Sequence, residues 1–250
     1  MLDFLKTKSS LKKILFIPDQ HFPYNDKKYW NLLMKVAKEV KFNIIAIMGD
    51  FLDCYSVSDY SKDPQRKSRL KDEVKSAKVA LRELEALKAE RYLYIEGNHE
   101  DRVWRLIKSK APEFDGLVSI ERLLDLDKWE YTPYMNHTTI GKLNLTHDVG
   151  HAGKYAAFQT LDAFQDNVGF GHTHRLAVVY QGNVKGVPHV CANFGWGGDV
   201  SKIDYMHQAK AKKDWMLGFG VGYLEPNGIV HLQVVPVVKY KCVVDGKFFQ

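Results

Sequence analysis

The chain has 250 residues, of which 45% are hydrophobic and 26% are charged. This composition excludes a collagen-like, low-complexity or wholly disordered protein. The length is compatible with one α/β domain, so we expect residues 1–250 to form a single globular unit. The 36 basic and 30 acidic residues give a formal charge of +6, which modestly favours phosphate-bearing partners.

The hydropathy pattern argues against a membrane location. The first residues mix charged and apolar side chains without a continuous hydrophobic segment, so we predict neither a signal peptide nor an anchor. The longest apolar stretch, which starts at Ile229, is interrupted and too short to span a bilayer. Three cysteines far apart in sequence fit neither a disulfide framework nor a zinc-thiolate site. We therefore expect a soluble, cytoplasmic protein, either a monomer or a homodimer.

In the first half of the chain, three short apolar runs predict buried strands over residues 14–17, 44–48 and 92–95. Apolar residues that recur at steps of three and four predict helices over residues 29–40 and 70–87. This alternation of strand and helix is typical of βαβ crossovers. In such sheets, ligands bind beyond the carboxyl ends of the strands.

The second half contains more strand signals than helix signals. We expect strands over residues 139–146, 168–170, 177–180, 217–224, 229–238 and 242–248. Turn residues at 226–228 and 245–246 predict hairpins. These patterns together predict two packed sheets, one in each half of the chain.

Histidine, carboxylate and amide side chains follow the ends of several apolar runs. They form five clusters: Asp19-Gln20-His21, Gly49 to Asp53, Gly97 to Glu100, Thr146-His147-Asp148 and Gly171 to His174. Nitrogen and oxygen ligands without thiolate suit Mn²⁺, Fe, Co, Ni or Zn²⁺ better than Ca²⁺ or Mg²⁺. The candidate ligands are more than one ion needs. The pattern therefore favours two ions about 3.5 to 4 Å apart that share a carboxylate.

The motifs D-x-H, G-D-x-x-D, G-N-H-E, H and G-H-x-H occur in this order between Asp19 and His174. The ordered set resembles the calcineurin-like metallophosphoesterase superfamily, and within it the DNA repair exonuclease-like branch of bacteria and phages. The resemblance implies an α/β fold, a four-layer α/β/β/α sandwich of two mixed β-sheets flanked by helices.

The resemblance also implies a centre of two divalent metal ions, for which Mn²⁺ is expected and Fe, Zn, Ni or Co are compatible. Asp50 would bridge the two ions. The remaining ligands would be Asp19, His21 and His174 for the first ion, and Asn98, His147 and His172 for the second.

Two further residues have catalytic roles in the implied mechanism, in which a metal-bound hydroxide attacks phosphorus. His99 would stabilise the phosphoryl oxygens or protonate the leaving group, and Asp53 would orient the His99 imidazole. Two cations acidify the attacking water, but an alkoxide leaving group still needs a proton.

Some of these residues have a second interpretation. Asp19 and Asp50 are also good helix N-cap residues. His137 and His151 lie close enough to His147 in the sequence to replace it as a ligand. We prefer His147 because it directly follows an apolar run.

Two arginines are the expected contacts with substrate phosphate. Arg102 follows the G-N-H-E turn and Arg175 follows the last ligand, and guanidinium groups bind phosphate oxygens through paired hydrogen bonds. The aromatic residues Phe194 and Trp196 either stack on a base or pack in the core. A basic cluster either follows a nucleic-acid backbone or keeps a helix soluble. Its members are Lys210, Lys212 and Lys213.

Three functions are compatible with these observations. The basic charge and the arginines favour a phosphodiesterase that acts on DNA or RNA. A phosphomonoesterase for phosphoproteins or nucleotides would use the same metal ligands. A catalytically silent scaffold is the third possibility, and the intact ligand set argues against it.

Overall fold

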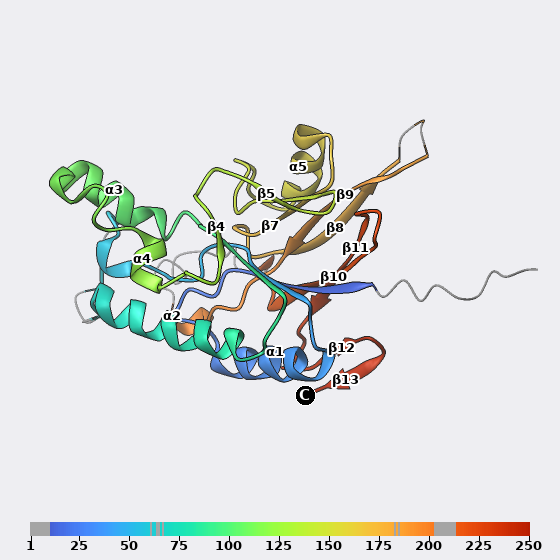
Figure 1. Cartoon of the computed structure of the whole chain (residues 1–250), viewed down its shortest axis with the longest axis horizontal. Coiled ribbons are helices and arrows are strands. Elements are labelled where there is room, and N and C mark those ends of the chain that lie inside the picture. The colour runs from blue at the N-terminus through green and yellow to red at the C-terminus, as the bar shows by residue number, and fades with distance from the viewer. Residues whose placement is uncertain are drawn as a thin grey trace, which may run out of the picture.

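The computed structural model describes residues 11–60, 62–63, 66, 68–182, 184, 186–202 and 214–250. The basic cluster of Lys210, Lys212 and Lys213 lies outside these residues. Within them, two sheets pack face to face and helices cover the outer face of each (Figure 1). The structure is therefore the four-layer α/β/β/α sandwich of two mixed sheets that the family resemblance implies.

The described helices are α1 (Lys27–Val40), α2 (Leu70–Glu85), α3 (Asp101–Lys110), α4 (Ile120–Leu124) and α5 (Ala156–Phe164), with 3₁₀ turns η1 (Tyr55–Val57), η2 (Pro112–Phe114) and η3 (Val200–Lys202). The first sheet has the order β11 (Val230–Pro236), β10 (Gly218–Leu224), β1 (Lys12–Ile17), β2 (Ile44–Ile47), β3 (Arg91–Ile95) and β4 (Glu130–Thr132). The second has the order β5 (Thr138–Ile140), β6 (Leu143–Leu145), β7 (Val168–Phe170), β9 (His189–Phe194) and β8 (Leu176–Gln181). A separate hairpin joins β12 (Cys242–Val244) to β13 (Lys247–Phe249).

The central strands of the first sheet are buried on both faces, which explains their continuous apolar runs. In β1, Leu15 and Ile17 belong to the core formed with α1 and α2. The alternate residues Ile14 and Phe16 belong to the core between the two sheets. α1 begins after Asp26, whose carboxylate accepts the first free backbone N–H groups of the helix.

The prediction of one sheet in each half of the chain is wrong. β10 and β11 come from the C-terminal half, but they extend the first sheet, because β10 pairs antiparallel with β1. Without this partner, the buried strand β1 would end the sheet with a row of unpaired backbone groups. The apolar pattern of β10 indicates burial and does not indicate which strand it joins.

Several other elements differ from the sequence-based expectation. Residues 139–146 form two strands, β5 and β6, because the chain turns at Gly141, where φ is 58°. Residues 242–248 likewise contain two strands, β12 and β13, and the turn predicted at Asp245 and Gly246 joins them. Strands β4 and β9 and helices α3, α4 and α5 were not predicted. β9 was missed because it runs directly into a glycine-rich stretch.

No helix among the described residues is both long and apolar enough to cross a membrane.

Candidate metal centre

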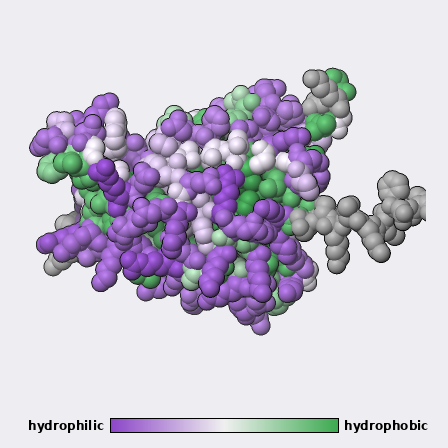
Figure 2. All heavy atoms as spheres, in the orientation of Figure 1, coloured by the Kyte–Doolittle hydropathy of each residue, from purple (hydrophilic) through white to green (hydrophobic). Residues whose placement is uncertain are grey.

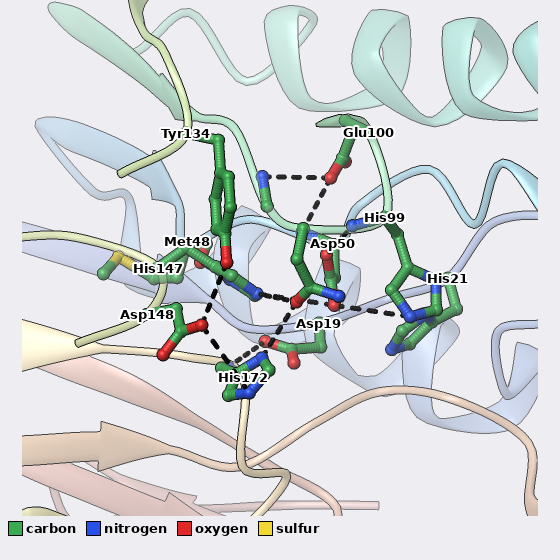
Figure 3. Close-up of polar contacts among 12 residues, drawn as sticks. Asp19, His21, Met48, Asp50, His99, Glu100, Tyr134, His147, Asp148 and His172 are labelled. Atoms are coloured by element: carbon green, nitrogen blue, oxygen red, sulfur yellow. Dashed lines mark hydrogen bonds and ion pairs between the residues drawn. The ribbon is translucent and has the colours of Figure 1, made fainter. Parts of the chain in front are cut away.

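All seven predicted ligands lie in loops that follow strand ends. Figure 3 labels five of them, which lie close together: Asp19, His21, Asp50, His147 and His172. The first sheet supplies Asp19, His21, Asp50 and Asn98, and the second supplies His147, His172 and His174. The parallel strands β1, β2 and β3 end at the same edge, and this geometry brings residues distant in sequence together. Five of the side chains are buried, while Asn98 and His172 are partly exposed.

The first group of potential ligands contains Asp19, His21, Asp50 and His174. The Nε2 atoms of His21 and His174 are 3.2 Å apart, and Asp19 Oδ2 lies 3.1 Å from His174 Nε2. Two ring nitrogens and a carboxylate oxygen therefore converge on one point, as ligands of a cation do.

The second group contains Asp50, His147 and His172, together with the amide of Asn98. Asn98 Oδ1 lies 2.9 Å from His172 Nδ1 and 3.1 Å from His147 Nε2. Asp50 Oδ2 lies 3.4 Å from His147 Nε2. Asp50 is thus the only described residue common to the two groups built on the predicted ligands.

A buried carboxylate oxygen without a well-formed hydrogen bond tests whether the site fits a cation. Asp19 is fully buried, and its Oδ2 atom accepts no hydrogen bond of good geometry, although His174 Nε2 lies 3.1 Å away. Buried carboxylates are costly unless they are paired. A cation held by Asp19, His21 and His174 would lie between these atoms and satisfy the oxygen. The donors are nitrogen and oxygen atoms, so the residues present fit the divalent ions expected from the sequence.

Burial and neighbouring charges set the protonation of the histidines. Burial lowers the pKa of His174 to about 4 despite the Asp19 carboxylate, so its nitrogen lone pair is available at neutral pH. Burial also acts to lower the pKa of His147, but the Asp50 carboxylate outweighs it and raises that pKa to about 10. Burial opposes ionisation of Asp50, yet the charges of His147 and His99 hold its pKa well below the ordinary value.

We expect metal binding at pH 7 to release more than one proton per chain, because His147 must lose its proton before it can ligate. Burial acts to lower the pKa of His21, but the Asp53 carboxylate outweighs it and raises that pKa, so this second ligand also releases protons. His174 contributes none, since its pKa lies near 4. The affinity should therefore rise with pH as long as His147 is protonated in the free protein. Calorimetric titrations with Mn²⁺, repeated in buffers of different ionisation enthalpy, measure the number of protons. No proton release and an affinity independent of pH would contradict this prediction.

The backbone is unusual at four of the ligands. His21, Asp50, His172 and His174 have φ values of 54°, 46°, 68° and 59°, in the left-handed region that non-glycine residues seldom occupy. Such conformations cost free energy and persist where the surrounding structure fixes them. At these residues the backbone turns sharply after a strand, and the ligand side chain is directed toward the proposed metal centre.

Glu100, the last residue of the G-N-H-E motif, ties the metal-binding loops together. Its buried carboxylate accepts the backbone N–H groups of Asp50, Leu52 and Gly97 and the hydroxyl of Tyr94 at 2.8 Å. Figure 3 shows Glu100 above Asp50. At Gly97, any side chain would collide with Asp50. The sequence analysis assigned no role to Glu100, although its place in the motif was a signal.

The predicted contact between Asp53 and His99 is present, and Asp53 makes a second contact that was not predicted. Its carboxylate pairs with His21 Nδ1 at 3.1 Å, which directs His21 Nε2 toward His174. His99 Nδ1 donates to the backbone carbonyl of Asp53 at 3.0 Å, while the carboxylate is 3.5 Å away. Asp53 therefore positions both histidines, but it holds His99 mainly through its main chain.

Two other contacts position the second-sheet ligands. His147 Nδ1 lies 2.8 Å from the carbonyl oxygen of Met48. Asp148 accepts the Tyr134 hydroxyl at 3.0 Å and lies 3.8 Å from His172 Nε2 (Figure 3). Tyr134 was not predicted, because it lies outside every motif.

The alternative interpretations of the ligands are not supported. No described helix begins directly after Asp19 or Asp50, so neither acts as an N-cap. His137 is exposed, and neither it nor His151 joins the ligand groups found among the described residues.

The two arginines expected to contact substrate are both bound to protein groups. Arg102 donates to His99 Nε2 at 2.9 Å and to the Asp53 carbonyl at 3.0 Å. Arg175 donates to the Thr173 carbonyl at 3.1 Å. Their contact with substrate stays a prediction.

The two aromatic residues considered for base stacking are buried in the protein. Phe194 stacks on Phe16 at 4.6 Å. Trp196 stacks on His174 at 5.0 Å. Both residues therefore pack in the interior, and Trp196 supports a predicted ligand.

Comparison with known proteins supports the fold. No family model and no curated protein match the sequence. Vacuolar Protein Sorting 29 from Cryptosporidium parvum has 17% identity and a TM-score of 0.50, with coverage of 95% of this chain and 94% of that one. Vps29 from Entamoeba histolytica, crystallised with Zn²⁺, has 14% identity and a TM-score of 0.44, with coverage of 94% and 95%. YfcE, a phosphoesterase from E. coli, has 13% identity and a TM-score of 0.43, with coverage of 88% and 98%.

At these identities the similarity is one of fold. The fold is that of the calcineurin-like phosphoesterases, as the sequence resemblance implied. In this chain it carries a buried Asp/His cluster that fits metal ions.

Proposed function

We propose that this chain is a cytoplasmic phosphodiesterase with two divalent metal ions, most suitably Mn²⁺, and that its substrate is DNA or RNA. One observation carries the proposal: Asp50 belongs both to the group of Asp19, His21 and His174 and to the group of His147 and His172. A carboxylate shared by two ligand groups is the arrangement that holds two ions for phosphoryl chemistry.

Bound ions would acidify a water molecule and neutralise charge on the phosphoryl oxygens. The chain itself positions the groups around the reacting phosphate. Asp53 directs His21, and Glu100 fixes the loops that carry Asp50 and Asn98. His99 Nε2 lies 3.8 Å from Asp50 Oδ2 and is therefore next to the proposed reaction centre, where it would protonate the leaving oxygen.

The preference for nucleic acid rests on charge. The chain has a formal charge of +6, which favours encounter with polyanions. Arg102 lies beside His99, and Arg175 follows His174. Phosphate oxygens would compete with the protein groups that these guanidinium groups now contact.

A panel of substrates tests the proposed function. With Mn²⁺ added, we expect hydrolysis of bis-p-nitrophenyl phosphate and of linear DNA or RNA. We expect slower hydrolysis of p-nitrophenyl phosphate and of a phosphopeptide. Comparison of linear with circular DNA shows whether a free end is needed, as an exonuclease requires. Hydrolysis of monoesters alone would overturn the proposal, and a chelator that leaves the turnover unchanged would exclude a metal-dependent reaction.

A further inference from the structure

A groove lies beside the second group of metal ligands, between α3 and the segment that follows β4. Its volume is about 1040 Å³, at the upper end of the usual range of about 300 to 1,000 Å³ for small-molecule pockets. One wall is a single face of α3, with Trp104, Arg105 and Lys108. The opposite wall includes Tyr134 and Met135. On the face shown in Figure 2, most of the surface is hydrophilic, and one of its hydrophobic patches lies at the left end, near α3 of Figure 1.

Two lining residues contact the loops of the proposed metal centre, although none of the seven ligands lines the groove itself. Arg105 donates to the backbone carbonyl of Asn98 at 2.9 Å. Tyr134 donates its hydroxyl to Asp148, which lies 3.8 Å from His172. These contacts place the groove next to the metal centre, on the side of the second group of ligands.

The outer part of the groove presents an aromatic surface. Trp104 is 49% exposed. The Lys108 ammonium lies 4.8 Å from the centre of its ring and helps to hold the indole in place. A planar, apolar group such as a nucleobase would stack here, because every base offers a π face to an aromatic side chain.

The charges along the groove argue for the uncharged part of a nucleotide. Among the described lining residues, Arg105 is paired with Asp101 at 2.9 Å. Glu96 accepts the Tyr131 hydroxyl and the Tyr134 N–H. Lys108 and Asp59 remain and balance each other. A row of phosphates would find no excess of positive charge here, whereas base and sugar need none.

We propose that this groove binds the nucleoside part of the substrate, with the base on Trp104 and the attached phosphate at the metal centre. The proposal rests on the proposed function, because it places the phosphate at the metal ligands. It goes further by giving the enzyme a preference for nucleotide esters over other phosphate esters.

Two ligands that differ only in the base test the groove. Calorimetry on the Mn²⁺-loaded protein should show adenosine 5′-monophosphate binding more tightly than ribose 5-phosphate. Trp104→Ala should weaken binding of adenosine 5′-monophosphate on the order of tenfold, the loss expected for one stacked base. Binding of ribose 5-phosphate should not change. Trp104→Phe keeps a ring and should restore most of the affinity.

Phe158→Ala is the matched control, since Phe158 is 58% exposed on α5 and does not line the groove. This variant should bind both ligands like the wild type. Equal affinity of the wild type for the two ligands, or an equal loss of both in Trp104→Ala, would overturn the groove proposal. Hydrolysis of diesters is measured separately. If the enzyme cleaves diesters but binds both ligands equally, only the groove proposal is overturned. If it cleaves no diester, the proposed function is overturned.

Discussion

Asp50→Asn is expected to lower diester turnover about a thousandfold or more and to reduce the metal content from about two ions per chain to one or fewer. The substitution keeps the size of the side chain. It also keeps an oxygen for the backbone N–H of His99, which donates to Asp50 Oδ1 at 2.8 Å. It removes the negative charge shared by the two ligand groups. Metal ions supply several kcal/mol of transition-state stabilisation, which corresponds to a factor of roughly 10³ in rate. Elemental analysis and initial rates on bis-p-nitrophenyl phosphate give the two readouts.

Asp127→Asn provides the control for this experiment. Asp127 is exposed and far from the ligand loops in sequence, so the same chemical change there should leave metal content and turnover at wild-type values. If Asp50→Asn retains two ions and wild-type turnover, Asp50 does not bridge a dinuclear centre.

The clustering of the first-sheet residues predicted as ligands could be expected from local signals. An apolar run predicts a strand, and the polar residue just beyond it lies at the strand end, as Asp19 and Asp50 do. The parallel pairing of β1 with β2 and of β2 with β3 then places these residues at one edge. No further information is needed to bring the first-sheet ligands together.

The features that escaped prediction depend on contacts between distant segments. β10 pairs with β1, which lies more than 200 residues away in the sequence. The hydropathy pattern of a strand does not indicate which other strand it pairs with. The Asp53 carboxylate binds His21, while the Asp53 backbone carbonyl binds His99. Residue type does not determine which group of Asp53 faces which histidine. Tyr134 reaches Asp148 from the segment after β4, which no motif marks.

The predicted ligands with positive φ show why local backbone propensity does not predict the geometry of this site. A histidine at φ 68° or an aspartate at φ 46° is not favoured by its own backbone preferences. The hydrogen bonds of Glu100 to the backbone of Asp50 and Gly97 help to impose the conformation of Asp50. The motif letters therefore predict the residues, but tertiary structure determines their geometry.

His99→Gln should reduce turnover about 10²- to 10⁴-fold when the leaving group is an alkoxide, and less than about tenfold when it is p-nitrophenolate. Glutamine has a similar reach but cannot carry the proton that a poor leaving group needs. His99 Nδ1 donates to a carbonyl and Arg102 donates to Nε2, so protein groups occupy both ring nitrogens in this arrangement. Phosphoryl oxygens that draw Arg102 away would free Nε2 to bind a proton and deliver it. Rates on dithymidine monophosphate and on bis-p-nitrophenyl phosphate separate the two cases.

The ratio of the two losses is the decisive quantity, because a general fall in stability or metal content lowers both rates together. His231→Gln is the matched control: this exposed histidine pairs with Glu225 on the surface and should affect neither substrate. Equal losses on both substrates in His99→Gln would mean that His99 acts through charge or position and not as the proton donor. Arg102→Ala adds a second readout. It removes the guanidinium from Nε2, so it should weaken substrate binding on both esters equally while the difference between leaving groups persists.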